Sequence, residues 1–420
     1  MILKETPMNS LRSRFTLFAV LCLFAALTGG QVLAQDTAIT YLTPPWAVPP
    51  DQAKLDAFTA ETGIAVEVQS LPSDQLYSRV QVAQASGQEP ADVIFLSEEA
   101  PSNIVATGVM EPLNSYIEST PDLDMTDFEG TDFWTVDGNI YGIPAYSQLV
   151  MADYNVEKAS QAGFDAPPAT WEELRDQAMA IKEQGIEDYP IAMAPIDWSW
   201  YLMALSMGDP MFDQELNPVF ADEGSQARQA MDLLLGFFRD DLISPELLTN
   251  TTAQHSTFWS GVGTFHQAWQ GSVRIANNPE VSQQAPNVAY LPLPGGGATW
   301  SQGAAIGIAA NSDAKDAAWQ FIQWYLNPDN QVDIYNAVGL VPSRLSVQQA
   351  LDAEGAIEGY DIIADQSTRV NNLPRQALWW GPFTQFVTEQ ILEAVQTDIS
   401  ADEVIDAIAE EWNDLKAEYE

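Results

Sequence analysis

The chain has 420 residues, of which 16 are basic and 59 are acidic, and its formal net charge at pH 7 is −43. A charge of this size repels phosphate backbones and anionic lipids, so we expect no binding of nucleic acid or of an anionic membrane. The acidic residues are spread along the whole chain, which favours a solvated acidic surface over a cation-binding tail. The length alone indicates two or three domains.

The first 34 residues have the pattern of a secretory signal peptide. Lys4, Arg12 and Arg14 precede a mostly apolar run at 15–27, and Val32-Leu33-Ala34 follows as a small-residue exit. About a dozen apolar residues are too few for the ~20 that a membrane-spanning helix needs, which disfavours the alternative of an uncleaved membrane anchor. We therefore expect cleavage after residue 34 and export of the remaining chain to the periplasm.

The single cysteine, Cys22, lies inside the apolar run. A lipoprotein site needs a small residue just before the cysteine, and Leu21 stands there, so we do not expect a lipid anchor. Cleavage removes Cys22, and the exported protein can then form no disulfide even in an oxidising compartment.

Strand and helix patterns alternate along the exported part. Apolar β-branched runs predict strands, and apolar residues spaced three or four apart predict helices. In chain order we expect a strand at 39–42, a helix at 52–61, a strand at 64–68, a helix at 76–83, a buried strand at 91–96, a helix at 171–184 that begins with a capping box at Thr170 and Glu173, a strand at 191–194, a helix at 227–239, a strand at 304–310, and helices at 313–326, 383–395 and 401–419. The alternation is typical of an α/β protein with a mostly parallel sheet.

Motifs for catalysis are few. The only histidines are His255 and His266, and the chain has no zinc, calcium or nucleophile-elbow motif, so we expect no metal, no cofactor and no catalytic residue. The glycines at 295–297 lack the Lys-Ser or Lys-Thr of a phosphate loop and predict a tight turn. A carboxylate pair of the glycosidase kind stays open, because a chain with 59 acids always offers one.

Tryptophan is abundant, with 13 residues. Several tryptophans lie where turns are expected, many of them just after a strand: Trp46, Trp198, Trp200, Trp269, Trp300, Trp379 and Trp380. Ligands of parallel α/β sheets bind outside the carboxyl ends of the strands, and a flat indole suits the apolar C–H face of a sugar ring. The alternative is that these residues are core or rim aromatics, which we expect for Trp319 and Trp324 on the amphipathic helix at 313–326.

Several segments, in their order over about 300 residues, match one known family. They are the entry at 39–68, the strand at 91–95, 108–113, the Gly138 to Pro144 turn with its Tyr141-Gly142-Ile143-Pro144 sequence, Tyr154-Asn155, the Pro167 to Leu174 stretch, 292–296, 303–308, 317–322 and 339–344. In these segments the chain resembles the extracellular solute-binding proteins of family 1, the carbohydrate-binding components of ABC importers.

The resemblance implies a two-lobed α/β periplasmic binding protein of type II with three hinge crossings. We expect the crossings near 147–149, near Gly303 and near 342–345. The N-terminal lobe would then comprise 35–147 and 303–343, and the C-terminal lobe 148–302 and 344–420. A ligand between the lobes would favour the closed state, which is the state that the transporter reads.

By position at strand ends and crossings, the resemblance places eleven candidate ligand contacts. They are Trp46, Ser97, Glu98, Tyr146, Asp197, Trp198, Trp269, Trp300, Gly303, Arg344 and Arg375. The two arginines are scarce cations in a very acidic chain, and either suits a sugar hydroxyl or a bidentate ligand carboxylate. Internal salt bridges are the alternative for both.

The function implied is capture of a mono- or oligosaccharide, or of a polyol, by a monomer that delivers it to ABC permease subunits at the inner membrane, and not an enzyme. A non-sugar solute, such as a polyamine or an organic anion, is the alternative within transport. A secreted carbohydrate-active enzyme and an envelope scaffold protein are the alternatives outside it.

Overall fold

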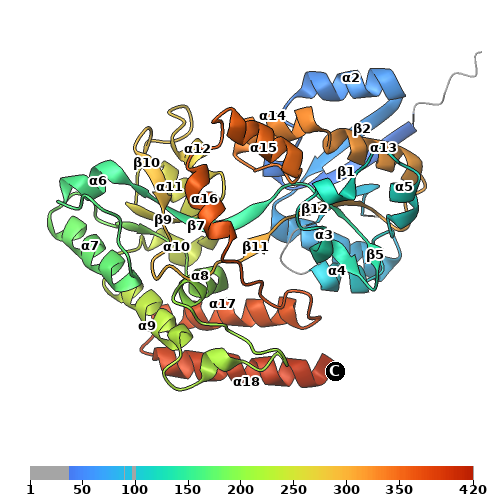
Figure 1. Cartoon of the computed structure of the whole chain (residues 1–420). Coiled ribbons are helices and arrows are strands. Elements are labelled where there is room, and N and C mark those ends of the chain that lie inside the picture. The colour runs from blue at the N-terminus through green and yellow to red at the C-terminus, as the bar shows by residue number, and fades with distance from the viewer. Residues whose placement is uncertain (1–36, 89, 97–100, 420) are drawn as a thin grey trace, which may run out of the picture.

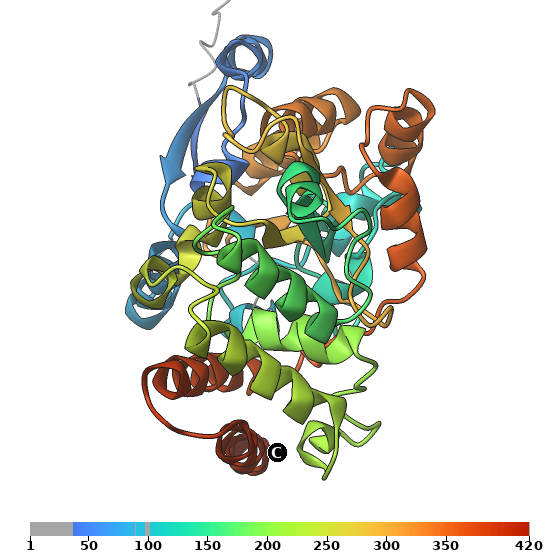
Figure 2. The same cartoon turned by 90° about the vertical axis from the view of Figure 1, so that its left-hand side faces the viewer.

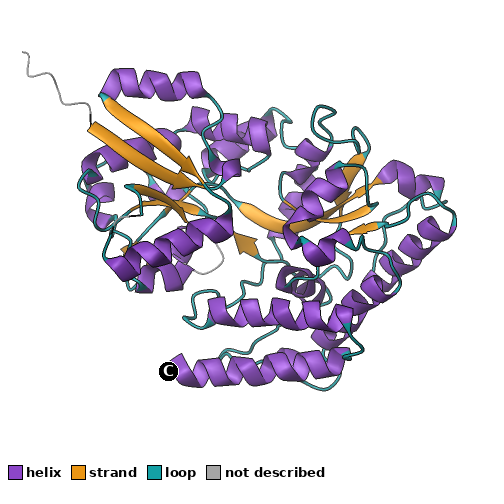
Figure 3. Ribbon diagram, turned by 180° about the vertical axis from the view of Figure 1, so that it is seen from behind, coloured by secondary structure: helices purple, strands orange, loops and turns teal. Residues whose placement is uncertain are grey.

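The computed structural model describes residues 37–88, 90–96 and 101–419, so the expected signal peptide lies outside the described residues. Two β-sheets lie side by side, each flanked by helices, and the chain runs between them more than once (Figures 1 and 3). We call the parts built on them the first lobe and the second lobe. Within the described ranges, no helix combines the length and the apolar character needed to cross a membrane.

The first lobe contains a five-stranded sheet. Its order is β2 (Ile64–Ser70), β1 (Thr37–Thr43), β3 (Val93–Leu96), β12 (Ala305–Ile308) and β6 (Ile143–Pro144). β1 pairs in parallel with β2 and β3, whereas β12 pairs antiparallel with β3 and β6. All four residues of β3 are buried, as its uninterrupted apolar run indicates for a strand covered on both faces.

The second lobe contains a sheet centred on one long strand, β7 (Gln148–Asn155). It pairs antiparallel with β9 (Phe265–Trp269), β10 (Val288–Leu291) and the short β11 (Ser301–Gln302), and β8 (Ile191–Ala192) pairs in parallel with β9. The expectation of a mostly parallel sheet is therefore wrong. β7 and β12 enter their sheets from the other lobe rather than through a helical crossover, and antiparallel pairing needs no such crossover.

Helices cover both sheets. In the first lobe they are α2 (Gln52–Thr62), α3 (Ser73–Ser86), α4 (Pro101–Ala106), α5 (Asn114–Glu118), α13 (Lys315–Tyr325) and α14 (Pro328–Val338). In the second lobe they are α6 (Val156–Gln161), α7 (Trp171–Glu183), α8 (Asp197–Ser206), α9 (Gln226–Arg239), α10 (Glu246–Thr249), α11 (Gln254–Trp259), α12 (Ser272–Ala276), α15 (Leu345–Ala353), α16 (Tyr360–Ser367), α17 (Trp380–Gln396) and α18 (Ala401–Tyr419). α17 and α18 pack together at one end of the molecule (Figure 2).

Two local predictions are confirmed. The Thr170 side chain accepts a hydrogen bond from the Glu173 amide at 3.1 Å, which caps α7. The Glu173 carboxylate accepts a hydrogen bond from the Ala169 amide at 2.8 Å, whereas the capping-box pattern indicates the amide of Thr170, one residue later. The glycines after β10 form a turn, in which Gly295 has φ +90° and leaves no room for a Cβ, since one would lie 2.5 Å from the Ser206 oxygen.

The chain changes lobes in segments that lie against one another. It leaves the first sheet after Pro144 and returns from the second after Gln302. The Ser147 amide donates to the Val341 oxygen at 2.9 Å, so a third segment runs beside the first. Gly303 approaches the Tyr146 carbonyl so closely that a Cβ would lie 2.7 Å from that oxygen. The three segments therefore form one compact junction.

A second close approach of two backbone segments lies nearby, at Gly271 and Gly339, and predicts that an alanine at position 271 strongly destabilises the fold. Gly271 has φ +101°, and a Cβ there would lie 1.8 Å from the Gly339 oxygen. Gly271→Ala should lower the free energy of unfolding by about 2 kcal/mol more than Gly224→Ala, because it adds overlap to backbone strain. Gly224 also has positive φ, +79°, but nothing lies within 4 Å of its added Cβ. Urea denaturation of both variants measures the difference, and equal losses would contradict the close approach.

Candidate functional site

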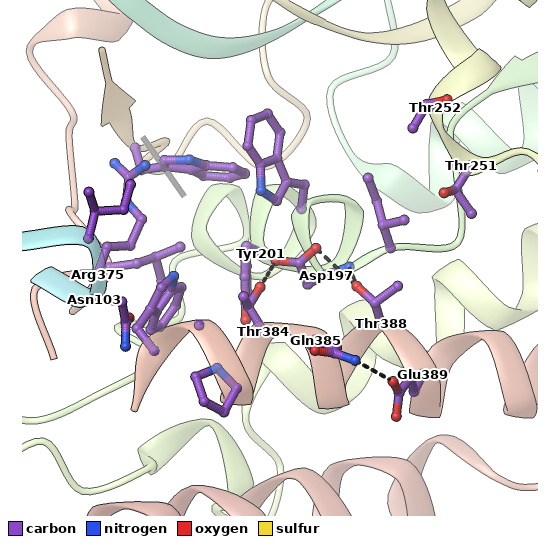
Figure 4. Close-up of a pocket in the computed structure, with 18 of the residues that line it drawn as sticks. Asn103, Asp197, Tyr201, Thr251, Thr252, Arg375, Thr384, Gln385, Thr388 and Glu389 are labelled. Atoms are coloured by element: carbon purple, nitrogen blue, oxygen red, sulfur yellow. Dashed lines mark hydrogen bonds between the residues drawn. The ribbon is translucent and has the colours of Figure 1, made fainter. Parts of the chain in front are cut away.

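A cavity with a volume of about 1010 Å³ lies between the lobes. α3, α4 and the following Thr107 line it from the first lobe, while α8, α11, α17 and the loops at Trp300 and Arg375 line it from the second. The polar residues are spread along its length, with Asn103 and Arg375 at one end in Figure 4 and Thr251 and Thr252 at the other. Both lobes therefore supply groups to one space.

Aromatic side chains of the second lobe form one wall. Trp198 and Trp300 meet edge to face with ring centroids 5.9 Å apart, and Tyr201 packs on Trp380 at 5.6 Å. Nine of the ten residues of α8 are buried, and Trp198 is the exception because its ring lies at the cavity. Broad, rigid indole faces bury a large apolar area at little cost in rotamer entropy, which suits them to ring-shaped ligands.

A buried carboxylate joins α8 to α17 below this wall. Asp197 accepts hydrogen bonds from the hydroxyls of Thr384 and of Thr388, the latter at 3.1 Å (Figure 4). Burial raises the pKa of Asp197 to about 6, although both threonine hydrogen bonds act to lower it. The two threonines are four residues apart and thus share one face of α17. The result is a cavity carboxyl that takes up a proton at a higher pH than an ordinary aspartate does.

Arg375 and Asn103, at one end of the cavity, make contacts between the two lobes. Arg375 of the second lobe donates to the Ser301 oxygen and lies over the Phe133 ring of the first lobe, 4.7 Å from its centroid. The Asn103 amide of α4 donates to the Leu378 oxygen at 2.6 Å. These contacts place the lobes in direct touch beside the cavity.

The expected ligand contacts divide into three groups. Asp197, Trp198, Trp300 and Arg375 line the cavity. Ser97 and Glu98 lie outside the described residues. Within the described part of the chain, five others do not line it: Trp46, Tyr146, Trp269, Gly303 and Arg344.

Three of these five are engaged near the junction of the lobes. The half-buried Trp46 ring meets the rings of Phe95 at 5.1 Å and Tyr146 at 5.7 Å. The Gly303 oxygen, expected to offer a backbone contact, accepts the Trp134 indole N–H at 2.9 Å. Packing and internal hydrogen bonds thus occupy positions that strand order alone assigned to a ligand.

Arg344 and Trp269 are also held by the protein. Arg344 forms an ion pair with Asp127 at 3.1 Å, donates to the Leu326 oxygen at 2.8 Å and lies over the Phe128 ring, which is the internal arrangement left open as its alternative. The Trp269 ring packs on His255 with centroids 4.7 Å apart. Neither side chain reaches the cavity lining.

The turn expected after the strand at 191–194 is wrong, because the residues that follow form a helix. Trp198 and Trp200 lie in α8, and Trp200 is fully buried in the core of the second lobe. α8 is apolar on nearly every side, so it shows no helical periodicity that would separate it from a loop of aromatic residues.

Sequence reasoning also missed several lining residues. These are Asn103, Tyr201, His255, Trp380, Thr384, Thr388 and Tyr419, among others. Thr384 and Thr388 carry a faint signal, since two hydroxyls four residues apart face the same way on a predicted helix. That pattern on its own is typical of a solvated helix face.

Metal-ligating side chains do not gather in the part of the chain that the structure describes, where no group of three or more His, Cys, Asp or Glu suits a metal ion. The cavity instead combines flat aromatic faces, hydroxyls, amides and a buried acid between two lobes. This fold and site define a two-lobed ligand-binding protein. The chain belongs to the bacterial extracellular solute-binding proteins, whose family model matches residues 53–358, well over half of its length.

Three curated relatives illustrate the range of this family. The chain is 25% identical to a probable amino-acid ABC transporter periplasmic-binding protein, y4oP, of Sinorhizobium fredii, over 69% of this chain and 68% of that protein. It is 24% identical to the maltotriose-binding protein of Pyrococcus abyssi, over 80% and 73%. It is 25% identical to spermidine/putrescine-binding periplasmic protein 1 of Haemophilus influenzae, over 76% and 79%.

Solved structures share the fold. Maltose-bound MalE3 of T. maritima aligns with a TM-score of 0.77 at 20% identity, covering 90% of this chain and 100% of that one. A solute-binding protein of Agrobacterium vitis with bound D-mannitol aligns with a TM-score of 0.77 at 19% identity, covering 91% and 99%. The architecture is therefore that of the two-lobed binding proteins, as the sequence patterns predict.

The raised pKa of Asp197 predicts a specific pH dependence of stability. An unperturbed Asp ionises near pH 4, so the folded chain holds this proton more tightly than the unfolded chain does. The free energy of unfolding should therefore fall as the pH rises from about 4 to about 6, by about 2–3 kcal/mol from this group, and stay constant above. Asp197→Asn should remove that loss.

Urea denaturation at about pH 4 and about pH 7 measures the effect. The quantity to compare is the difference between Asp197→Asn and the wild type at each pH, with Asp232→Asn, an exposed position on α9, as the matched control. If both variants follow the wild-type profile in parallel, burial does not raise the pKa of Asp197.

Proposed function

We propose that this chain captures a sugar or a polyol in the cavity between its lobes and delivers it to the permease of an ABC importer. The observation that carries the proposal is the tryptophan wall facing neutral hydrogen-bonding side chains across a cavity to which both lobes contribute. A saccharide matches both, because its ring presents apolar C–H faces and a rim of hydroxyls.

The polar groups support a neutral polyhydroxylated solute. The Asn103 and Gln385 amides carry both a donor and an acceptor, while Thr384 and Thr388, whose protons go to Asp197, can accept from a solute hydroxyl. The two cavity-lining acids are already engaged, Asp197 with Thr384 and Thr388, and Glu389 with the Gln385 amide at 2.9 Å. Among the relatives and structures compared, maltotriose, maltose and mannitol binders fit this chemistry.

Delivery follows from the two-lobed arrangement. A solute that touches α8 and α17 on one side and α4 on the other stabilises the closed state by as much as it binds that state better. The family is extracellular, and with the signal peptide expected at 1–34 we place the protein in the periplasm. The closed, loaded form would be the one that the permease subunits recognise.

A polyamine is the second candidate solute. A relative binds spermidine or putrescine by name, and an ammonium group is attracted to both a carboxylate and an aromatic face. Asp197 would provide the carboxylate, and the aromatic wall of Trp198, Tyr201, Trp300 and Trp380 would provide the ring faces. The hydrogen bonds that Asp197 already accepts from Thr384 and Thr388 argue against it, since they occupy both of its oxygens.

A thermal-shift series with purified protein separates these candidates. Maltotriose, D-mannitol, spermidine and L-glutamate are tested one at a time. A solute at about 100 times its dissociation constant stabilises the folded state by roughly 2.7 kcal/mol, so a saccharide or polyol should raise the melting temperature by several degrees. Stabilisation by spermidine alone would favour the second candidate, and no shift with a wide solute panel would contradict both.

One substitution tests the tryptophan wall. Trp198→Ala should weaken binding of the stabilising solute at least about tenfold, because it removes the exposed ring face while the rest of α8 stays buried. Trp324→Ala, another half-buried tryptophan that packs on the first-lobe core away from the cavity, is the control and should leave the affinity unchanged. Isothermal titration calorimetry gives both values, and equal affinities in the two variants would remove Trp198 from the site.

A further inference from the structure

The two histidines form a hydrogen-bonded row that starts at a buried carboxylate. Asp153 on β7 and His266 on β9 are cross-strand partners, and Asp153 Oδ1 lies 2.8 Å from His266 Nδ1. His266 Nε2 in turn lies 2.8 Å from Nδ1 of His255 on α11. The other carboxylate oxygen of Asp153 accepts the Ser272 hydroxyl at 2.8 Å. We call Asp153, His266 and His255 the histidine row.

The row runs from the interior to the cavity. The side chains of Asp153 and His266 have no exposed surface, and the Phe258 ring stacks on His266 with centroids 4.4 Å apart. His255 is half-buried beneath the Trp269 ring and lines the cavity. Of the histidine row, only His255 therefore lines the cavity.

Hydrogen-bond polarity fixes the tautomers along the row. An ionised carboxylate only accepts hydrogen bonds, so His266 carries its proton on Nδ1. Asp153 thus accepts one hydrogen bond at each oxygen, and we take His266 as the neutral imidazole, whose Nε2 is then an acceptor. His255 must donate to it from Nδ1, which leaves His255 Nε2 as a bare lone pair.

We propose that His255 is a specificity-determining residue whose Nε2, held as an acceptor by the histidine row, takes a hydrogen bond from a hydroxyl of the solute. This inference rests on the proposed function, since it needs a solute in the cavity. Nδ1 of His255 is the nitrogen that contacts His266, and Nε2 makes no hydrogen bond within the described residues.

The consequence is selection by polarity at this corner of the cavity. A solute hydroxyl donates a hydrogen bond to the lone pair. A carboxylate oxygen of a competing solute would face another acceptor and lose its bound water without a new hydrogen bond, which weakens its binding. Burial of the ring holds the pKa of His255 well below its usual range, so the lone pair persists in mildly acidic surroundings. The buried part of the row keeps the acceptor in place before the solute arrives.

A second proton on His266 would reverse the hydrogen-bonding character of His255 at the cavity. If His266 carried protons on both nitrogens, it would donate to His255 Nδ1, and His255 would present an N–H to the solute. Asp153→Asn is designed to impose the same reversal: with its oxygen accepting from Ser272, its amide donates to His266 Nδ1, whereas an amide turned the other way would donate to the Ser272 oxygen and keep the wild-type tautomers. A nearly isosteric substitution outside the cavity therefore changes an acceptor at the cavity into a donor.

Nitrogen NMR of ¹⁵N-histidine-labelled protein tests the assignment at about pH 7 without any solute, because protonated and bare ring nitrogens resonate far apart. The wild type should show both imidazoles singly protonated on Nδ1. Asp153→Asn should move both protons to Nε2. Asp209→Asn, another buried carboxylate of the second lobe that accepts two backbone amides, is the matched control and should keep the wild-type pattern.

A doubly protonated His266, or a proton on His255 Nε2 in the wild type, overturns the proposal whatever the variants do. The wild-type spectrum also decides the matter if Asp153→Asn does not fold. Failure of the proposed function shows itself differently, as the absence of any stabilising solute with the expected tautomers in place.

Affinity provides the second measurement. If maltotriose or D-mannitol stabilises the protein, its dissociation constant should rise by about tenfold or more in Asp153→Asn, because the reversed ring presents a donor to a donor. The Asp209→Asn control should bind as the wild type does. Unchanged affinity in Asp153→Asn, with the tautomers reversed, would show that His255 does not accept from the solute and would overturn its role in specificity.

Discussion

The close packing of three backbone segments at the junction of the lobes is the constraint on which the rest of the molecule depends. Gly303 touches the Tyr146 carbonyl, and the Ser147 amide bonds to Val341. A side chain at Gly303 would force the segments apart. Because they stay together, the two sheets lie side by side across a short junction, and helices from both lobes border one cavity.

Buried polar groups then set what this cavity offers. Asp197 and the histidine row are both anchored on the side away from the solute, by α17 in one case and by β7 in the other. Such groups are costly to bury unless their partners are complete, and complete partners hold them in one orientation. The cavity thus presents fixed donors and acceptors next to rigid aromatic faces, which is how a binding protein separates solutes of similar size.

Much of the fold could be predicted from the sequence. The first strands and helices, the caps of α7 and the turn at Gly295 follow local rules, since hydrophobic period, capping residues and glycine act over a few residues. The direction of β7 and β12 could not be predicted in this way, because it depends on their passage between lobes. The candidate site was harder still. Of the expected ligand contacts, Trp198 and Arg375 line the cavity, whereas Arg344 and Trp46 contact residues distant in sequence. Thr384 and Thr388 have the pattern of an ordinary polar helix face.

The most direct test of solute capture between the lobes is a crystal structure grown with the saccharide or polyol that stabilises the protein. We expect the solute in the cavity, with a ring or carbon chain against Trp198 and polar contacts both to α17 and to Asn103 of the first lobe. A solute bound at another place, or held by one lobe alone, would contradict capture by closure of the two lobes.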